Sequence, residues 1–183
     1  MGYTHYFKVK KEISQKKWDG FIEEVKKIYK NLPEHSESSG GYCQDEPLFL
    51  SGCARFRDPK MDSEMIWVNG SSIPSKYRTQ TEHWYDQDPG NLDHETFGFD
   101  RKPNGDRGGF CKTARKPYDL FVQAVLILAR KHFTKTEFEF SSDGYGEEWL
   151  VAYEFVSGIV EGIKPEHMKS ICGRYETLDI FKK

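Results

Sequence analysis

The chain has 183 residues, of which 37% are hydrophobic and 31% are charged. This composition is ordinary for one globular domain, so we expect a single domain over residues 1–183. The formal net charge of -2 argues against an extended nucleic-acid surface, and any anion site must therefore be local. We expect a cytoplasmic protein without membrane contact, because no run approaches the ~20 apolar residues that span a bilayer and the start lacks a signal-peptide pattern.

The first half of the chain predicts a strand, a helix and a hairpin. Residues 3–10 alternate apolar and polar side chains, which is the pattern of a strand with one buried face. Apolar residues then recur at helical spacing over 18–32, and Pro33 ends this pattern. Two short apolar runs, 47–57 and 65–70, are separated by turn-forming residues and predict a pair of antiparallel strands.

The long segment 71–93 has no clear periodicity, although it is rich in aromatic and basic residues. An irregular loop of this length inside a compact domain is usually functional, so this segment is a candidate lid. Aromatic faces and an arginine plane stack on nucleobases. The candidate ligand contacts in this segment are Tyr77, Arg78, His83 and Trp84. The alternative is that these side chains only anchor the loop by packing.

The second half of the chain predicts two further strands and two further helices. Residues 95–101 and 135–140 alternate as strands do, and an almost wholly apolar helix lies between them. Ser142 or Asp143 could cap a last helix that includes 149–156. The order of elements favours an α+β sandwich: a mostly antiparallel sheet of about five strands, with three helices packed on it.

The apolar helix has an unusual cationic entrance. Lys112, Arg115 and Lys116 directly precede it, although a helix dipole disfavours each cation at this end by ~0.3–1 kcal/mol. A phosphate would resolve the conflict, since backbone N–H groups at a helix start bind anions and Thr113 could add a hydroxyl. The alternative is internal pairing, because Asp119 is spaced to meet two of these cations along the helix.

Other residues suggest chemistry more weakly. His5 lies on the predicted inward face of the first strand, where a histidine is either a hydrogen-bonded core residue or a general acid or base. No H-E-x-x-H or G-x-S-x-G motif is present, so we expect no metal, no cofactor and no serine hydrolase. The four cysteines form no C-x-x-C pair and are expected to be free and buried: Cys43, Cys53, Cys111 and Cys172.

Four segments resemble, in this order, a family of small uncharacterised proteins encoded by bacteriophages. They are "MGYTHYF" at 1–7, "HETFGF" at 94–99, "FCKTARKPYD" at 110–119 and "SSDG" at 141–144. The resemblance implies a phage or prophage source, a single compact domain and action in the host cell cytoplasm, and it implies no particular activity. The chain departs from the family at Phe7, where members often carry Trp, and over the region 34–93.

Three classes of function follow from these observations. In the first, the protein binds a phosphate-containing small molecule such as a nucleotide and does not turn it over; phage proteins that sequester nucleotide immune signals are an analogy for this anti-defence role. In the second, it is a phosphodiesterase or nuclease-like enzyme that uses His5 or His94. In the third, its loop inhibits a host defence enzyme. The candidate ligand-binding residues are Lys112, Thr113, Arg115, Lys116, Tyr77, Arg78, His83, Trp84 and His5. The sequence leaves open whether the chain forms a homo-oligomer.

Overall fold

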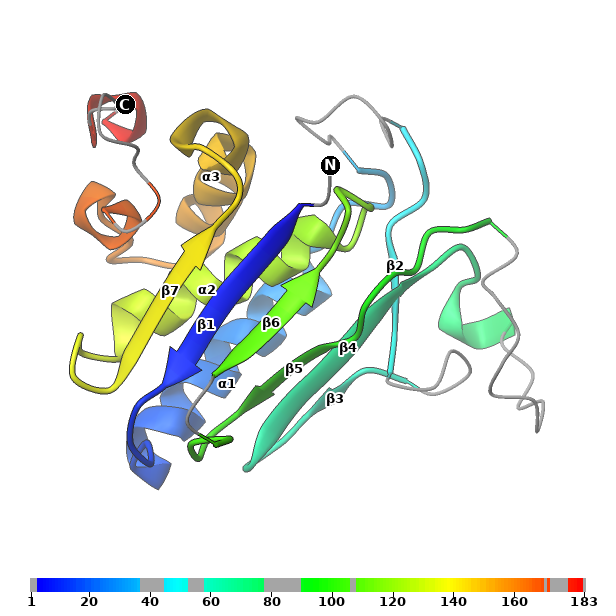
Figure 1. The fold of residues 1–183 in the computed structure, drawn as a ribbon. Helices are drawn as coiled ribbons and strands as arrows, with labels where there is room; N and C mark the ends of the chain where they lie inside the picture. The colour runs from blue at the N-terminus through cyan, green and yellow to red at the C-terminus, as the bar shows by residue number, and fades with distance from the viewer. Residues whose placement is uncertain are drawn as a thin grey trace.

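The computed structural model describes residues 3–36, 45–52, 58–77, 90–105, 108–169, 171 and 178–182. Within these residues the chain forms three α-helices and two antiparallel sheets, which confirms the predicted α+β class (Figure 1). The described part of the chain contains seven strands rather than about five, because residues 60–61 and 109–112 form two short strands that the sequence pattern did not predict.

The first sheet has the order β6-β1-β7, and its central strand is the first of the chain. Its strands are β1 (Thr4–Val9), β6 (Gly109–Lys112) and β7 (Phe138–Ser142). Strand β1 runs antiparallel to both neighbours. The start of β1 therefore lies beside the ends of β6 and β7.

The second sheet is built around β4, which pairs with β2, β3 and β5. Its strands are β2 (Phe49–Ser51), β3 (Lys60–Met61), β4 (Met65–Ser71) and β5 (Phe97–Asp100). Strand β5 lies next to β6 (Figure 1), and the Glu95 N–H donates to the Lys112 carbonyl at 3.4 Å. The two sheets therefore adjoin along β5 and β6.

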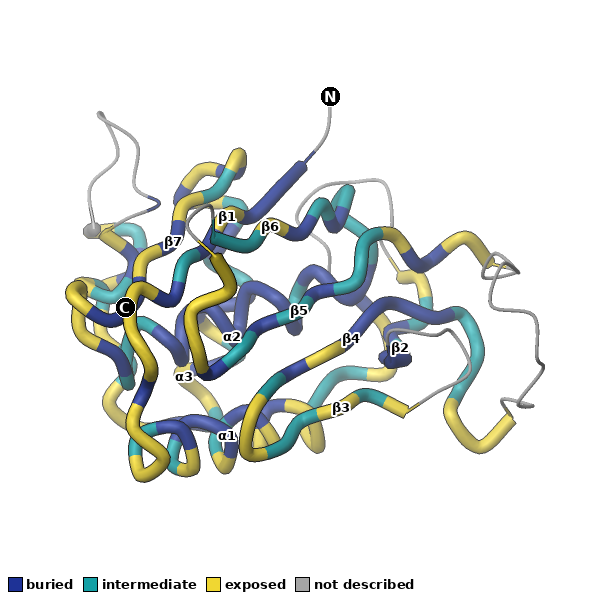
Figure 2. The backbone as a smooth tube through the Cα atoms, turned by 60° about the horizontal axis from the view of Figure 1, so that its bottom comes forward, coloured by how far each residue is buried: buried dark blue, intermediate teal, exposed yellow. Residues whose placement is uncertain are grey.

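The helices cover one side of the sheets. They are α1 (Gln15–Lys30), α2 (Asp119–His132) and α3 (Leu150–Ile159), and α1 and α2 lie behind the strands in Figure 1. Figure 2 shows α2 buried over most of its length while α1 alternates between buried and exposed positions. This burial confirms the prediction that the apolar helix lies in the core. No helix in the described residues is long and apolar enough to cross a membrane.

The segment 71–93 is only partly described. Strand β4 extends to Ser71, a short 3₁₀ helix η1 covers Ser75–Tyr77, and the chain is described again from Gly90. Three of the predicted loop contacts, Arg78, His83 and Trp84, lie outside the described residues. The prediction of a lid in this segment therefore stays a prediction.

Candidate functional site

The start of β1, the ends of β6 and β7, and the first turn of α2 meet at one end of the first sheet (Figure 1). We call residues 112–119, which connect β6 to α2, the β6–α2 corner. In the strand register, Thr4 lies opposite Lys112 and His5 lies opposite Ser142. The β6–α2 corner therefore begins beside the start of β1, and Ser142 of β7 lies on the other side of β1.

Asp119, the first residue of α2, is the centre of a buried polar network. Its Oδ1 lies 2.7 Å from His5 Nε2 and accepts a hydrogen bond from Thr113 Oγ1 at 2.6 Å. Its Oδ2 accepts a hydrogen bond from Gln123 Nε2 at 3.0 Å, and the same amide reaches the Tyr3 hydroxyl at 3.1 Å. A carboxylate in the first turn also interacts favourably with the helix dipole. Asp119 thus faces the core and does not pair with the entrance cations.

His5 continues this network to β7. Its side chain has 0% exposure, and its Nδ1 lies 3.0 Å from Ser142 Oγ. The rings of Tyr3 and Trp149 stand edge-on to the imidazole, each at a centroid distance of 5.1 Å. With the proton on Nε2, the ring donates to Asp119 and accepts from the serine hydroxyl. Both ring nitrogens then have partners, which is the condition for burying a histidine at low cost.

Ser142, His5 and Asp119 are connected in the manner of a serine hydrolase triad, but the surroundings do not suit that chemistry. An oxyanion needs N–H donors aimed at the space beside the nucleophile. Here the Asp143 N–H donates to the Thr4 carbonyl, and the Gly144 N–H donates to Ser142 Oγ itself. The imidazole is also sealed from solvent. We therefore interpret the three residues as a brace that joins β1, β7 and α2.

Two of the three entrance cations are bound within the protein. Arg115 donates from Nε and Nη2 to Glu148 Oε1 at 3.0 and 2.7 Å, and its guanidinium lies 4.1 Å from the Tyr3 ring centroid. Lys116 Nζ donates to the Asn91 carbonyl. Internal pairing therefore occurs, although the carboxylate comes from a distant segment and not from Asp119 as the helical spacing suggested.

Lys112 differs from the other two cations. Its backbone N–H donates to Glu95 Oε2 at 2.7 Å, which fixes the end of β6 against the segment that leads into β5. Its neighbour Cys111 is buried and faces the helices. Because successive side chains of a strand point to opposite faces, Lys112 belongs to the face that the helices do not cover.

The corner contains a strained turn. Ala114 and Arg115 have φ angles of 52° and 58°, and Lys116 N–H donates back to the Thr113 carbonyl at 3.0 Å. Each non-glycine residue in this left-handed region costs ~1–2 kcal/mol. Such strain persists where surrounding contacts over-determine it, and it is common at functional sites. This turn could not be predicted from the sequence, because neither strained position is glycine or asparagine.

The residues that carry the phage resemblance come together here. "MGYTHYF" supplies His5, "HETFGF" supplies Glu95, "FCKTARKPYD" supplies Thr113 and Asp119, and "SSDG" supplies Ser142. Segments far apart in the chain thus meet in one network. Their joint presence in the sequence has a physical reason, because each supplies a hydrogen-bond partner that another segment needs.

Several predicted ligand contacts are placed differently. Thr113 and His5 are buried, and their polar side-chain atoms are hydrogen-bonded to Asp119 and Ser142, so their predicted contact with a ligand stays a prediction. Tyr77 is 67% exposed, and the Lys76 ammonium lies 4.8 Å from its ring centroid. It belongs to η1, which contacts β2 and lies across the second sheet from β7 (Figure 1). His94, the other candidate acid or base, is exposed.

Cys111 is free and buried, as the sequence predicted, whereas Cys43, Cys53 and Cys172 lie outside the described residues. The Cys111 thiol donates to the Glu95 carbonyl at 3.4 Å, and burial raises its pKa far above the usual range. A thiol that stays protonated is a poor nucleophile. Among the described residues, no group of three or more His, Cys, Asp or Glu side chains is arranged to hold a metal ion.

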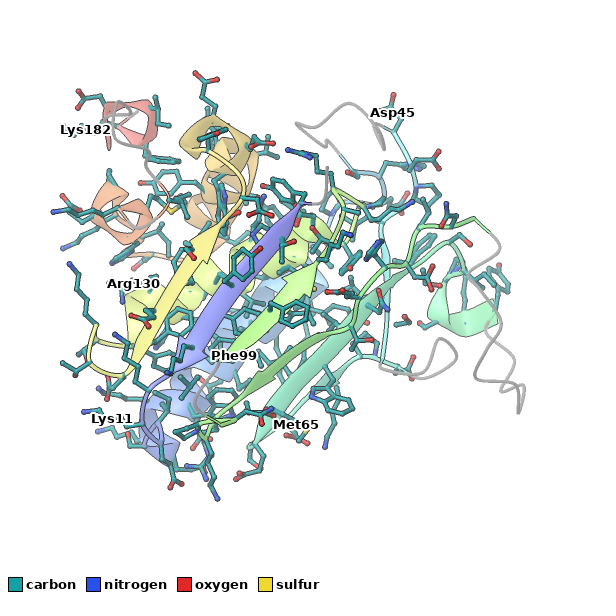
Figure 3. The ribbon with its side chains drawn as sticks, viewed as in Figure 1. Lys11, Asp45, Met65, Phe99, Arg130 and Lys182 are labelled. Carbon is teal, nitrogen blue, oxygen red and sulfur yellow. The ribbon has the colours of Figure 1, made fainter. Side chains whose placement is uncertain are left out.

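The open face of the first sheet carries an aromatic pair that the sequence reasoning missed. Tyr6 and Phe110 are direct cross-strand partners on β1 and β6, and they are 45% and 61% exposed. Side chains stand on this face of the strands, turned to the viewer in Figure 3, with the helices behind. A shallow hollow of about 390 Å³ is lined by both rings and by Lys8, Glu139 and Ser141 among others. The alternation of residues 3–10 already placed Tyr6 opposite the buried His5 face.

No family model, curated protein or solved structure matches the chain.

Proposed function

We propose that the protein binds a phosphate-containing small molecule of the nucleotide class and releases it unchanged. The observation that carries the proposal is the exposed cross-strand pair of Tyr6 and Phe110, with Lys112 two residues along the same face of β6. Large exposed aromatic side chains in register offer a surface on which a base can stack. An ammonium group beside them suits the phosphate.

The charges of this face favour an anion. The outward positions of β1, β6 and β7 carry Lys8, Lys112 and Glu139. Lys10, which follows β1, forms an ion pair with Glu139. Lys8 and Lys112 thus bring positive charge to this face, although the Glu95 carboxylate contacts the main chain of Lys112 and the whole protein is slightly acidic. In a protein of low net charge, an anion site needs local positive charge of this kind.

The β6–α2 corner supports the site from behind. Lys112 is fixed through its own main chain by Glu95, and the strained turn that follows it is held by the network around Asp119. Arg115 and Lys116 stay bound to protein partners and contribute positive potential at the start of α2. Because a rigid corner loses little conformational entropy when a ligand binds, it lowers the free-energy cost of binding.

Binding without turnover is favoured over catalysis by His5, whereas His94, the other candidate acid or base, is exposed. A general acid or base must come within hydrogen-bond reach of the reacting group. His5 is sealed between two aromatic rings with both nitrogens engaged. In keeping with the phage resemblance, the biological role that we propose is to sequester a nucleotide immune signal in the cytoplasm of an infected host.

The test is a calorimetric titration of the protein with a panel of mono-, di- and cyclic nucleotides, followed by analysis of the recovered ligand. We expect at least one nucleotide to bind and to be recovered intact. Loss of one stacking ring costs ~1–3 kcal/mol, so Phe110→Ala should weaken binding by ~5- to 150-fold. Lys112→Ala should also weaken binding, and the loss of affinity should be larger at low salt than at high salt, because salt screens the attraction between the ammonium and the phosphate.

Tyr77→Ala is the matched control, because it removes an equally exposed aromatic ring from another surface. It should leave binding unchanged. If Tyr77→Ala weakens binding and Phe110→Ala does not, the site lies at the loop and not on the open face. Recovery of a hydrolysed nucleotide would instead show an enzyme, and no binding across the panel would reject the proposal.

A further inference from the structure

The chain contains two Asn-Gly pairs, and the fold places them in opposite environments. Asn104 and Gly105 lie in the connection between β5 and β6, where both residues are exposed. Asn69 and Gly70 lie within β4, where both residues are buried. Asparagine is a chemically labile residue. A glycine after it leaves the next backbone nitrogen unhindered, because glycine has no side chain and its backbone rotates freely.

The Asn104 side chain is held only weakly. Its Nδ2 donates to Asp100 Oδ2 at 3.3 Å in an exposed contact. Gly105 has a φ of 69°, and a Cβ atom built there would meet nothing within 4 Å. In the described part of the chain, no acceptor binds the Gly105 N–H. The backbone nitrogen of Gly105 is therefore free to turn toward the amide carbon of Asn104.

The Asn69 amide is fixed by hydrogen bonds at both of its ends. Its Nδ2 donates to the His94 carbonyl at 3.0 Å and to Thr96 Oγ1 at 3.3 Å. Its Oδ1 accepts from the His94 N–H at 3.1 Å and from the Gly70 N–H at 2.8 Å. Gly70 also has no room to move, because a Cβ atom built there would collide with the Leu92 carbonyl oxygen. The same dipeptide is thus protected in β4 and unprotected after β5.

We propose that Asn104 is a site of spontaneous modification, at which the backbone nitrogen of Gly105 attacks the side-chain amide and water completes the conversion to aspartate and isoaspartate. In the first step, a bond forms between the Gly105 nitrogen and Asn104 Cγ, and the Cγ–Nδ2 bond breaks. The proton of the Gly105 N–H leaves with Nδ2 as ammonia, and a cyclic imide remains. In the second step, water opens either carbonyl C–N bond of the ring, which gives aspartate or its isomer with the chain passing through the β-carboxyl. Neither step requires the ligand of the proposed function.

The product changes the charge at the edge of the open face. A carboxylate replaces the Asn104 amide beside Asp100, and the hydrogen bond between the two side chains is lost because its donor is lost. A small hollow of about 30 Å³ is lined by both residues and by Lys102 and Gly109, and Gly109 also lines the larger hollow that contains Phe110. The modification therefore adds negative charge next to the first sheet.

The experiment incubates the full chain in mildly alkaline buffer at body temperature and follows its peptides by mass spectrometry. We expect the Asn104 peptide to gain about 1 Da and to separate into two isomers. The Asn69 peptide should change at least ~10-fold more slowly, since the hydrogen bonds at both ends of its amide must first break. In urea the two peptides should change at similar rates, because only the fold distinguishes the two pairs.

Three variants test the chemical route. Gly105→Ala places a methyl group beside the attacking nitrogen and should slow the change at Asn104. Asn104→Gln would have to close a larger ring and should abolish the change. Asn104→Asp supplies the chromatographic reference for the aspartate product, and thermal unfolding of each variant checks that the fold is retained.

Three results would overturn the proposal. The first is an Asn104 that stays unmodified in the folded protein over the time in which it reacts in urea. The second is an Asn69 that reacts as fast as Asn104 in the folded protein, because the protection argued from the β4 contacts would then be absent. The third is a Gly105→Ala variant that reacts at the unchanged rate, because the attacking nitrogen would then not be that of residue 105.

Discussion

Removal of the Asp119 carboxylate tests whether the buried network holds the corner. In Asp119→Ala, three buried donors lose their acceptor: His5 Nε2, Thr113 Oγ1 and Gln123 Nε2. A hydrogen bond to a charged group contributes ~1.5–3 kcal/mol, and partial relaxation and water entry reduce the sum. We therefore expect the free energy of unfolding to fall by about 4 kcal/mol, a large share of the ~5–15 kcal/mol of a typical domain.

The assay is urea unfolding followed by circular dichroism, with a series of matched variants. Asp119→Asn keeps one acceptor oxygen but turns an amide N–H₂ toward Gln123, so it should cost about 1–2 kcal/mol. Thr113→Val removes one donor and should cost about 1 kcal/mol. In the double variant Thr113→Val with Asp119→Ala, the two costs should not add. Asp119→Ala already leaves the Thr113 hydroxyl without its acceptor, so Thr113→Val then removes a donor that is unpaired.

Glu147→Ala is the control, because it removes an exposed carboxylate from the turn before α3. It should change the free energy of unfolding by less than about 0.5 kcal/mol. The reasoning is refuted if Asp119→Ala costs no more than this control. Additive costs in the double variant would show that Thr113 and Asp119 act independently, against the short contact between them.

Two further predictions concern stability. Glu137 binds Lys17 Nζ at 2.8 Å, and this ion pair together with hydrogen bonds lowers its pKa to about 2. Because the folded pKa lies below the unfolded value of ~4.3, its contribution of up to about 3 kcal/mol is present above that pH and is lost as pH falls toward 2. Glu137→Gln should flatten the loss between pH 5 and 2 in urea titrations, and an unchanged slope would contradict this origin. Gly144→Ala would place a methyl group 2.4 Å from the Tyr3 hydroxyl and should destabilise the protein by ~1–3 kcal/mol in thermal unfolding. Gly158→Ala has open space around a helical position and should stabilise the protein by ~0.5–1 kcal/mol. Equal effects of the two substitutions would show that the contact at Gly144 can relax.

The fold class was accessible from the sequence because hydrophobic periodicity is local. The alternation around His5 predicted β1, and the almost wholly apolar run after Pro117 predicted the buried helix α2. The short strands β3 and β6 are different, since each is defined by its pairing, β3 with β4 and β6 with β1, and not by its own pattern. A strand of two to four residues has too few positions to show a period.

The site was accessible only in part, because helical spacing predicts local partners and the real partners are distant. Asp119 is well spaced to meet Arg115, but its place in the first turn of α2 directs it toward β1. Arg115 instead reaches Glu148, 33 residues along the chain. The exposed aromatic pair could not be predicted for another reason. Alternation predicts that Tyr6 points outward, but only the fold shows that the helices do not cover that face of the sheet.

The buried network and the open face are linked through strand register. Neighbouring positions on a strand point to opposite faces, so a slip of one residue would bury Tyr6 and expose His5. The contacts of His5 with Ser142 and Asp119 fix β1 against β7 and α2, and those of Glu95 fix the end of β6. The polar core thereby keeps Tyr6 opposite Phe110. It follows that a mild change such as Asp119→Asn should weaken ligand binding while the protein remains folded. The variant loosens the contacts that hold β1 in register, and ligand binding depends on that register because it places Tyr6 opposite Phe110.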